Sequence, residues 1–323
     1  MNVSVIIPLY NKQDDIQNCL QSIEKQTTLP DEIIIINDGS TDKSLEKVMG
    51  FKSKTNLNIR IYSHNNVGPA ASRNCGIKIS KNDFIAFLDA DDMWGKYYLK
   101  TIQRLINKFP NAGIYATAYK FLLPGGRLRK ANLQGISTKH QDVLIDNYYR
   151  AALLGDPPLW TSAVVVKKKV FYEVGFFYEN DVMGEDLELW LRIAHQFPIA
   201  FSWYLGAVYN KKLSNRVTNK NIAPLERKLF STGNQLLLHE DLQDEFKFYL
   251  REYLNKHYLL SARDYILIGD SKKAKEALKK ICTIYHIKRK YWLFFLSLLP
   301  NNLLKILWNM KHKGSGLYRS FGQ

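Results

Sequence analysis

Continuous apolar runs alternate with amphipathic stretches along roughly the first hundred residues of the chain. The apolar runs cover residues 3–9, 32–37 and 84–88, and a further strand is expected over 58–63. Strands without polar alternation are expected where helices cover both faces of a sheet. The intervening stretches, with apolar residues at helical spacing, cover residues 14–27, 41–51 and 69–80. This alternation predicts parallel βαβ units, so the carboxyl ends of the four strands should meet at one edge of a sheet.

The pattern is less regular after residue 92 and becomes helical beyond residue 223. The expected helices cover 96–109 and 185–196, and the expected strands cover 113–120 and 160–166. Two further helices are predicted over 234–268 and 271–285. We therefore expect an α/β domain over 1–215, divided into halves 1–92 and 93–215, and a smaller all-helical region over 216–323.

Polar residues follow each of the four strands, at the edge where open α/β sheets bind their ligands. Pro8, Tyr10 and Asn11 lie at the end of the first strand and in its loop. The second loop covers residues 37–42. Its Asp-Gly turn and its capping Ser or Thr have a purely structural explanation as well as a functional one.

Three carboxylates, at Asp89, Asp91 and Asp92, follow directly after the fourth strand. Carboxylates a few ångströms apart repel one another and raise one another's pKa unless a cation lies between them. Their hard oxygen atoms suit Mg²⁺ or Mn²⁺, and Mg²⁺ is commonly held by one or two carboxylates together with substrate phosphates. The alternative is a solvated acidic turn.

The formal net charge of +16 favours anionic partners. No Asp or Glu follows Glu276, whereas nine Lys and Arg do, interleaved with apolar and aromatic runs at 291–300 and 303–308. Such a tail predicts a segment that lies on an anionic membrane surface. The alternatives are a basic helix packed on its own domain and nucleic-acid binding, but no recognisable nucleic-acid module accompanies the charge, so no nucleic-acid partner is expected.

Cysteine usage and the N-terminus bear on the compartment. Cys19, Cys75 and Cys282 are far apart and odd in number, which predicts a reducing compartment and neither a disulfide framework nor a zinc site. The first residues lack a basic region, so no signal peptide is expected. Because no apolar run reaches the roughly 18 residues of a membrane-spanning helix, we expect a cytoplasmic protein.

Five sequence blocks, in order along the chain, resemble those of the family 2 glycosyltransferases, the inverting group with the GT-A fold. They cover residues 5–11, 36–42, 72–76, 87–92 and 184–192. The resemblance extends over about residues 1–210. It implies a nucleotide-sugar-binding mixed sheet flanked by helices. The Gln-X-X-Arg-Trp block of processive polymerases does not occur, so a non-processive bacterial type that transfers single sugars is favoured.

The resemblance implies a donor site of eight residues, namely Pro8, Tyr10, Asn11, Asp38, Arg73, Asn74, Asp89 and Asp91. Asp38 would accept a hydrogen bond from a base N–H. Arg73 would bind phosphate oxygens with its planar fork, with a structural salt bridge to a loop aspartate as the alternative. Asp91 would ligate a divalent metal, Mn²⁺ or Mg²⁺, that bridges two phosphates, and Asp89 would contact the ribose or a metal-bound water.

The resemblance also implies that Asp186 is the general base, with Glu185 as the second candidate. Both acids lie where a helix should begin, so ordinary first-turn charge is the structural alternative. Attack by an acceptor hydroxyl opposite the departing diphosphate would invert the anomeric centre. The metal would stabilise the charge on that diphosphate as a Lewis acid.

The predicted activity is transfer of one sugar from a nucleoside diphosphate sugar, expected to be a UDP-sugar, to a saccharide acceptor in cell-surface polysaccharide synthesis. The basic tail adds the expectation that the acceptor is lipid-linked and the protein peripheral to the inner face of the cell membrane. A nucleotidyltransferase acting on a sugar phosphate is one alternative, because it shares the nucleotide sheet and the metal-binding aspartates. A catalytically silent sugar-nucleotide-binding module is the other.

Overall fold

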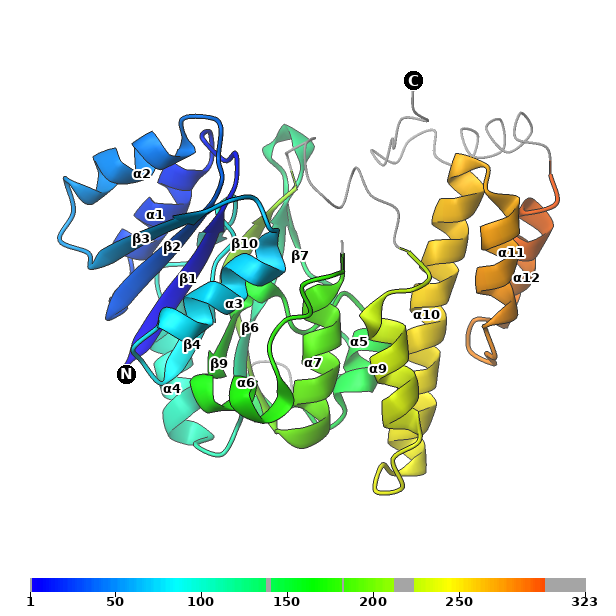
Figure 1. Cartoon of the computed structure of the whole chain (residues 1–323). Coiled ribbons are helices and arrows are strands. Elements are labelled where there is room, and N and C mark those ends of the chain that lie inside the picture. Colours follow the sequence, from blue (N-terminus) through cyan, green and yellow to red (C-terminus); the bar gives the residue numbers. More distant parts are fainter. Residues whose placement is uncertain (1, 138–140, 182, 212–223, 300–323) are drawn as a thin grey trace. The chain divides into compact units, whose positions relative to one another are not determined.

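The computed structural model describes residues 2–137, 141–181, 183–211 and 224–299. The chain forms two compact units (Figure 1). Unit 1 consists of Met1–Asn180 and Glu185–Leu213, and unit 2 consists of Asp181–Gly184 and Ser214–Gln323. The second half of the predicted basic and aromatic tail, residues 300–323, lies outside the described residues.

A single ten-stranded sheet runs through the described part of unit 1. Its strands are β1 (Val3–Leu9), β2 (Glu32–Asp38), β3 (Ile59–His64), β4 (Phe84–Phe87), β5 (Met93–Trp94), β6 (Ile114–Leu122), β7 (Leu128–Lys130), β8 (Val143–Leu144), β9 (Val164–Lys167) and β10 (Ile199–Asn210). Their order is β3-β2-β1-β4-β9-β6-β10-β5, with β7 on β6 and β8 on β10.

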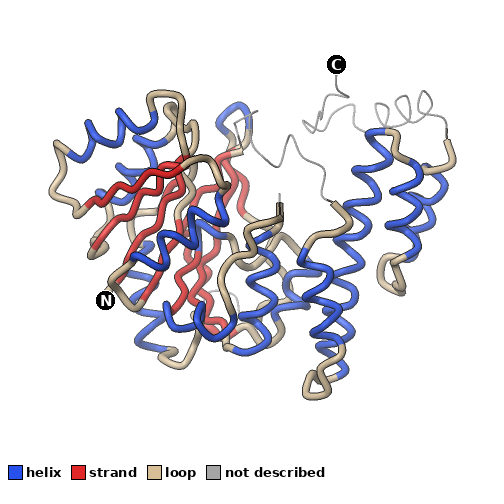
Figure 2. Tube along the Cα trace, in the orientation of Figure 1, coloured by secondary structure: helices blue, strands red, loops and turns tan. Residues whose placement is uncertain are grey.

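The predicted mixed α/β sheet is confirmed. Strands β1 to β4 are parallel, whereas β9 runs antiparallel to both β4 and β6. All seven residues of β2 are buried, as expected for a strand covered on both faces. The expected strand over 160–166 is shorter, because its first residues form the 3₁₀ turn η2 (Thr161–Ala163) before β9 begins. Figure 2 shows the strands with helices around them.

Seven α-helices accompany the sheet in the described part of unit 1. They are α1 (Ile16–Glu24), α2 (Ser44–Lys52), α3 (Pro69–Ile79), α4 (Tyr98–Lys108), α5 (Tyr148–Leu154), α6 (Lys168–Val174) and α7 (Glu185–Gln196), and the second 3₁₀ turn is η1 (Pro124–Gly126). Chain order runs outward from β1 to β3 and then returns to β4, so right-handed crossovers place α1 and α2 on one face and α3 on the other.

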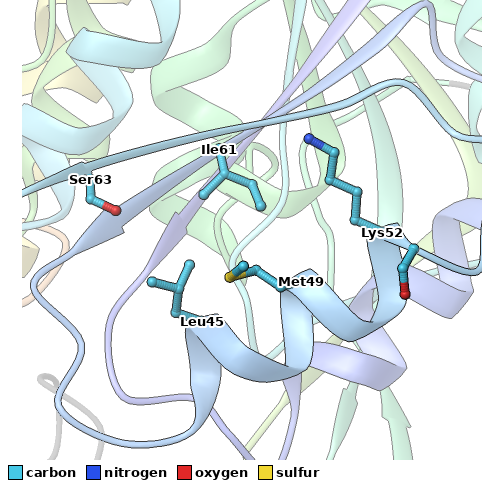
Figure 3. A pocket seen from close by; sticks show the side chains of 6 residues that line it. Leu45, Met49, Lys52, Ile61 and Ser63 are labelled. Atoms are coloured by element: carbon cyan, nitrogen blue, oxygen red, sulfur yellow. The ribbon is translucent and has the colours of Figure 1, made fainter.

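Helix α3 approaches β1 closely because it carries Gly76. A Cβ atom at this position would lie 2.5 Å from Cγ2 of Ile6, which is fully buried in β1. On the other face, α2 and the edge strand β3 border a groove of about 510 Å³, lined by Leu45, Met49, Lys52, Ser53, Ile61 and Ser63 (Figure 3). None of the predicted site residues lines this groove.

Unit 2 is helical where it is described. Its helices are α9 (Lys228–Leu237), α10 (Asp244–Ile268), α11 (Ser271–Lys279) and α12 (Ile287–Leu296). The rings of Phe230 on α9 and Tyr258 on α10 stack with centroids 3.8 Å apart. Among the described residues, no helix is both long and apolar enough to span a bilayer.

Two helix boundaries in unit 2 differ from the sequence prediction. The single helix expected over 234–268 is wrong, because α9 ends at Leu237 and α10 begins at Asp244. Acidic residues in the first turn of α10 favour a new helix start through the helix dipole. The helix expected over 271–285 ends at Lys279. The following segment turns back onto α10, where Glu252 accepts hydrogen bonds from the Thr283 hydroxyl and the Ile284 N–H.

Candidate active site

The loops after β1 and β4 meet where the strand order reverses, which is the usual ligand crevice of an open α/β sheet. An ion pair joins the two loops. Lys12 Nζ, from the loop after β1, lies 2.7 Å from Oδ2 of Asp91, from the loop after β4. The Asp91 side chain is about 10% exposed. The acidic cluster therefore has a lysine ammonium beside it, which the sequence analysis did not anticipate.

The loop after β1 is also joined to the loop after β2. Asn11 has a φ of +49°, in the left-handed region that Asn tolerates. Its Oδ1 accepts a hydrogen bond from the Thr41 N–H at 2.9 Å, and its own N–H donates to Ser40 Oγ at 3.2 Å. Asn11 thus fixes the path of the predicted nucleotide loop, while the neighbouring Tyr10 is 45% exposed. Pro8 is half-buried in β1.

Asp38, at the end of β2, is buried and accepts hydrogen bonds from the loop after β3. Its carboxylate accepts hydrogen bonds from the N–H groups of Val67 at 2.8 Å and Gly68 at 2.9 Å, and His64 Nδ1 lies 3.2 Å away. Gly68 has a φ of +94°, which suits glycine. Because an ionised carboxylate offers about four acceptor positions, these contacts leave capacity for a base N–H.

Arg73 connects the two halves of the site. Its side chain, on α3, is buried, and its guanidinium nitrogens lie 2.8 Å from Asp89 Oδ1 and 2.8 Å from Glu185 Oε1. Burial alone would lower the pKa of Arg73, but Asp89 and Glu185 raise it further above its usual range. The salt bridge to Asp89 is the structural alternative raised for Arg73, and the second bridge brings the start of α7 to the same cation.

Glu185 is surrounded in a way that disfavours its ionised form. Burial and the charge of the adjacent Asp186 raise its pKa, and the Arg73 guanidinium only partly offsets them. Glu185 is therefore protonated more readily than an ordinary glutamate.

Asp186 occupies the next position on α7. Its Oδ2 accepts a hydrogen bond from Thr161 Oγ1 at 2.9 Å, and its Oδ1 accepts from the Leu187 N–H at 2.8 Å. The position of Asp186 therefore depends on the 3₁₀ turn η2, through Thr161.

The residues on either side of Thr161 bind Asp92. Trp160 Nε1 donates to Asp92 Oδ2 at 3.1 Å, and the Ser162 hydroxyl donates to the same oxygen at 2.7 Å. The Asn210 N–H donates to Oδ1 at 3.0 Å. Asp92 is fully buried, so it has a structural role among the three aspartates. Ser162 also accepts a hydrogen bond from the Asp89 N–H at 3.1 Å.

Asn74 supports the fold beside the site. Its amide nitrogen donates to the Phe177 carbonyl at 2.8 Å and to Glu179 Oε1 at 2.7 Å, and its oxygen accepts from the Phe177 N–H. Because a side-chain amide has two hydrogens, both are used within the protein in this structure. The predicted contact between Asn74 and the nucleotide stays a prediction.

The carboxylates after β4 supply hard oxygen atoms of the kind that a divalent metal accepts. No group of three or more His, Cys, Asp or Glu side chains gathers as a metal site among the described residues. Mg²⁺ commonly needs only one or two carboxylates when phosphates and waters complete its shell. Asp89 and Asp91 each lie against a cation, Arg73 and Lys12, which shows that this cluster is compensated by positive charge.

The predicted site residues did not include Lys12, Thr161, Trp160 or Ser162. Lys12 follows directly after the first family block, residues 5–11, so the sequence alone could have predicted that it lies at the ligand-binding edge of the sheet. The other three lie in the irregular second half, where a short 3₁₀ turn has no periodicity to reveal it. Only the fold brings them to Asp92 and Asp186.

The sequence is similar to those of known proteins. Residues 4–174 match the model of the family described as Glycosyl transferase family 2. The chain is 44% identical over 90 residues to the uncharacterized glycosyltransferase YibD of Escherichia coli, a match covering 28% of this chain and 26% of that protein. It is 42% identical over 98 residues to the poly(ribitol-phosphate) beta-glucosyltransferase of Bacillus spizizenii, covering 29% of this chain and 16% of that protein. These matches span less than a third of either relative.

A solved structure has a similar fold. The crystal structure of S. aureus TarS 1-349 in complex with UDP-GlcNAc superposes with a TM-score of 0.68 over 96% of this chain and 92% of that chain, at 18% identity. At this identity the likeness concerns the fold.

Proposed function

Because the chain belongs to glycosyl transferase family 2 and has the GT-A fold, we propose that it transfers one sugar at a time from a nucleoside diphosphate sugar to a saccharide acceptor, with inversion. The observation that carries the proposal is the double ion pair of Arg73 with Asp89 and Glu185. One buried guanidinium holds the donor-side aspartate loop and the first turn of α7 together. Groups that bind a diphosphate and groups that take a proton can therefore act on the same sugar.

The donor side of the site suits a UDP-sugar. Asp38 lies at the end of β2 with acceptor capacity for a base N–H, and Tyr10 is exposed on the loop after β1. A divalent ion held by Asp91, with Asp89 beside it, would stabilise the charge that develops on the departing diphosphate as a Lewis acid. Because TarS binds UDP-GlcNAc in its crystal structure, a uridine nucleotide is the first donor to test.

The acceptor side rests on Asp186. An acceptor hydroxyl must lose its proton as it attacks the anomeric carbon, and Asp186 would accept that proton as general base. Thr161 and the Leu187 N–H fix both carboxylate oxygens, so the base is oriented before the acceptor arrives. Glu185 has a different role in this proposal, since its direct bond to Arg73 joins it to the donor side.

The proposal includes a lipid-linked acceptor and attachment of the protein to the inner face of the cell membrane. The described part of the tail supports this, because α12 carries exposed aromatic side chains beside Lys288 and Arg289. The glucosyl transfer to poly(ribitol-phosphate) named for the B. spizizenii relative makes a cell-surface polymer a reasonable acceptor class.

A donor screen followed by product analysis tests the proposal. The purified full chain is heated with Mn²⁺ and each of a panel of nucleoside diphosphate sugars, because a ligand that binds only the folded state raises the melting temperature. The stabilising donor is then incubated with saccharide acceptors, and the anomeric configuration of the product is read by NMR. An α-linked donor should give a β-linked product, and the Asp186→Asn variant should keep donor binding but lose transfer. Retention of configuration, or undiminished transfer by Asp186→Asn, would contradict the proposed mechanism.

A further inference from the structure

Helix α12 presents a large apolar surface to solvent. Five side chains of the helix, and Leu298 just after it, are between 45% and 66% exposed. The five are Ile287, Tyr291, Trp292, Phe294 and Phe295. We call these six residues the α12 face. Their spacing of three and four residues places them along one side of the helix. Soluble proteins rarely expose contiguous apolar surface of this kind unless it binds something.

The exposure does not arise from a helix that is poorly packed. Leu293 and Leu296, on the opposite side of α12, are only 4% and 7% exposed. Lys290 Nζ donates a hydrogen bond to the Ile281 carbonyl at 2.7 Å, and Ser297 also is buried. The helix is therefore seated in unit 2 by one side and exposes the other side as a fixed surface.

We propose that the α12 face docks on an anionic lipid bilayer, with its aromatic side chains at the headgroup level and cationic side chains of the same helix on lipid phosphates. Aromatic rings with one apolar and one polar end, such as Tyr291 and Trp292, favour the membrane–water interface. Lys288 and Arg289 lie on the same helix, and the described chain after Glu276 contains no acidic residue. This combination of an apolar side and adjacent cations is that of a helix lying in the interface plane.

The charge distribution favours a bilayer over a second copy of this chain. A twofold interface through the α12 face would bury Lys288 in both copies, because Lys288 lies three positions before Tyr291 and so on the same side of the helix, and like charges in a buried interface are unfavourable. Lysine is also depleted in the cores of protein interfaces. An anionic membrane accommodates both features, because its acyl region takes the rings and its headgroups take the cations.

The inference deepens the lipid-linked acceptor of the proposed function, since it names the surface that would hold the enzyme at that acceptor. Vesicle flotation of the purified full chain tests it without donor or acceptor. Vesicles of phosphatidylcholine with phosphatidylglycerol should carry the protein upward, and vesicles of phosphatidylcholine alone should do so several-fold less. Each cation near an anionic surface contributes about fivefold to binding, so raising the salt should release the protein.

Substitutions locate the docking surface. The double variant Tyr291→Ser, Phe295→Ser should lower the bound fraction at least about tenfold, since it removes two aromatic side chains from the interface. Leu238→Ser is the matched control, because Leu238 is 81% exposed in the same unit but lies at the end of α9, and it should float as the wild type does. Lys288→Gln, Arg289→Gln should lose the preference for anionic vesicles. If the aromatic double variant fails to fold, this charge variant decides the question.

Four outcomes would overturn the proposal. They are equal binding to neutral and anionic vesicles, flotation of the aromatic or charge variants like the wild type, a lipid-free dimer that the aromatic variant abolishes, and competition by duplex DNA that is lost in the charge variant. Transfer to a water-soluble acceptor should be unchanged in all these variants. If the protein transfers sugar but does not float with vesicles, the docking proposal fails and the proposed function stands. If it floats with vesicles but transfers no sugar, the proposed function fails and the docking proposal stands.

Discussion

Thr161 Oγ1 donates a 2.9 Å hydrogen bond to Oδ2 of Asp186, and this bond ties the proposed base to the 3₁₀ turn η2. The turn itself is fixed from both sides, since Trp160 and Ser162 bind the buried Asp92. Asp92, in the acidic cluster after β4, therefore supports Asp186 on α7 indirectly, through the turn η2. The donor-side loop and the proposed base share one support.

Thr161→Val is predicted to lower kcat without changing the KM for the donor. The variant keeps the shape of the side chain but removes the hydroxyl that orients Asp186, and a hydrogen bond to a charged group contributes about 1.5–3 kcal/mol. We expect a fall in kcat of about tenfold to a hundredfold, measured by steady-state transfer kinetics. Thr161→Ser restores the hydroxyl and should recover most of the rate. A kcat for Thr161→Val equal to that of the wild type would show that Asp186 needs no such support.

Asp91→Asn is predicted to abolish metal-dependent nucleotide binding. With UDP at about 100 times its Kd, binding adds about 2.7 kcal/mol to the free energy of unfolding, which is visible as a rise in melting temperature. We expect that rise to need Mn²⁺, to vanish with a chelator, and to be absent in Asp91→Asn. The exposed Asp83, also in unit 1, provides the control Asp83→Asn. An unchanged Mn²⁺-dependent rise in Asp91→Asn would remove Asp91 from the donor site.

Glu185→Gln is predicted to change how stability depends on pH. The pKa of Glu185 is raised in the folded protein by burial and by Asp186, so its contribution to stability is complete below its ordinary value near 4.5 and is lost as the pH rises through the folded value. The glutamine variant has no such loss. The melting temperature of the variant minus that of the wild type should therefore increase with pH across that window. Each 1 kcal/mol lost from the free energy of unfolding of the wild type corresponds to about 2–4 °C in a domain of this size.

Thermal melts of both proteins from pH 4 upward, at constant ionic strength, measure this difference. The removal of one anion from Arg73 shifts the whole curve of the variant but not its slope against pH. A difference in melting temperature that stays constant, or falls as the pH rises, would mean that Glu185 is held in its ionised form.

Gly76→Ala is predicted to destabilise unit 1 by about 1–3 kcal/mol, because the added methyl group overpacks α3 against Ile6. Gly50→Ala is the matched helical control. Gly50 lies on α2 with nothing within 4 Å of the added Cβ, so alanine there should stabilise by up to about 1 kcal/mol. Chemical denaturation of the two variants measures both changes. Equal stability of Gly76→Ala and wild type would show that α3 can move away from β1 at little cost.

The first half of the fold could be predicted because its strands and helices are long and regular. Ile16, Leu20 and Ile23 recur at helical spacing, and all three are fully buried in α1. The parallel order of β1 to β4 follows from the alternation of strands and helices, and with it the edge at which Asp38, Asp89 and Asp91 lie. The family blocks extended this to α7 and its acidic first turn.

The rest of the site depends on contacts between distant parts of the chain. Nothing in the local sequence distinguishes Asp92, a buried structural acid, from Asp91 one position earlier. Thr161 and Ser162 lie in a turn of three residues, and their partners are 25 and 70 positions away. The helix break before α10 was missed for a related reason, since helical spacing of apolar residues continues across it.

Because the single guanidinium of Arg73 pairs with both Asp89 and Glu185, substitutions at these three positions are expected to depend on one another. A chain that lost Arg73 alone would keep two carboxylates pressed together without a counterion, and a chain that lost either acid would weaken its anchoring on one strand end or one helix. Among related chains, the residues at these three positions should therefore change together. A related chain in which only one of them has changed should be one in which sugar transfer is no longer under selection.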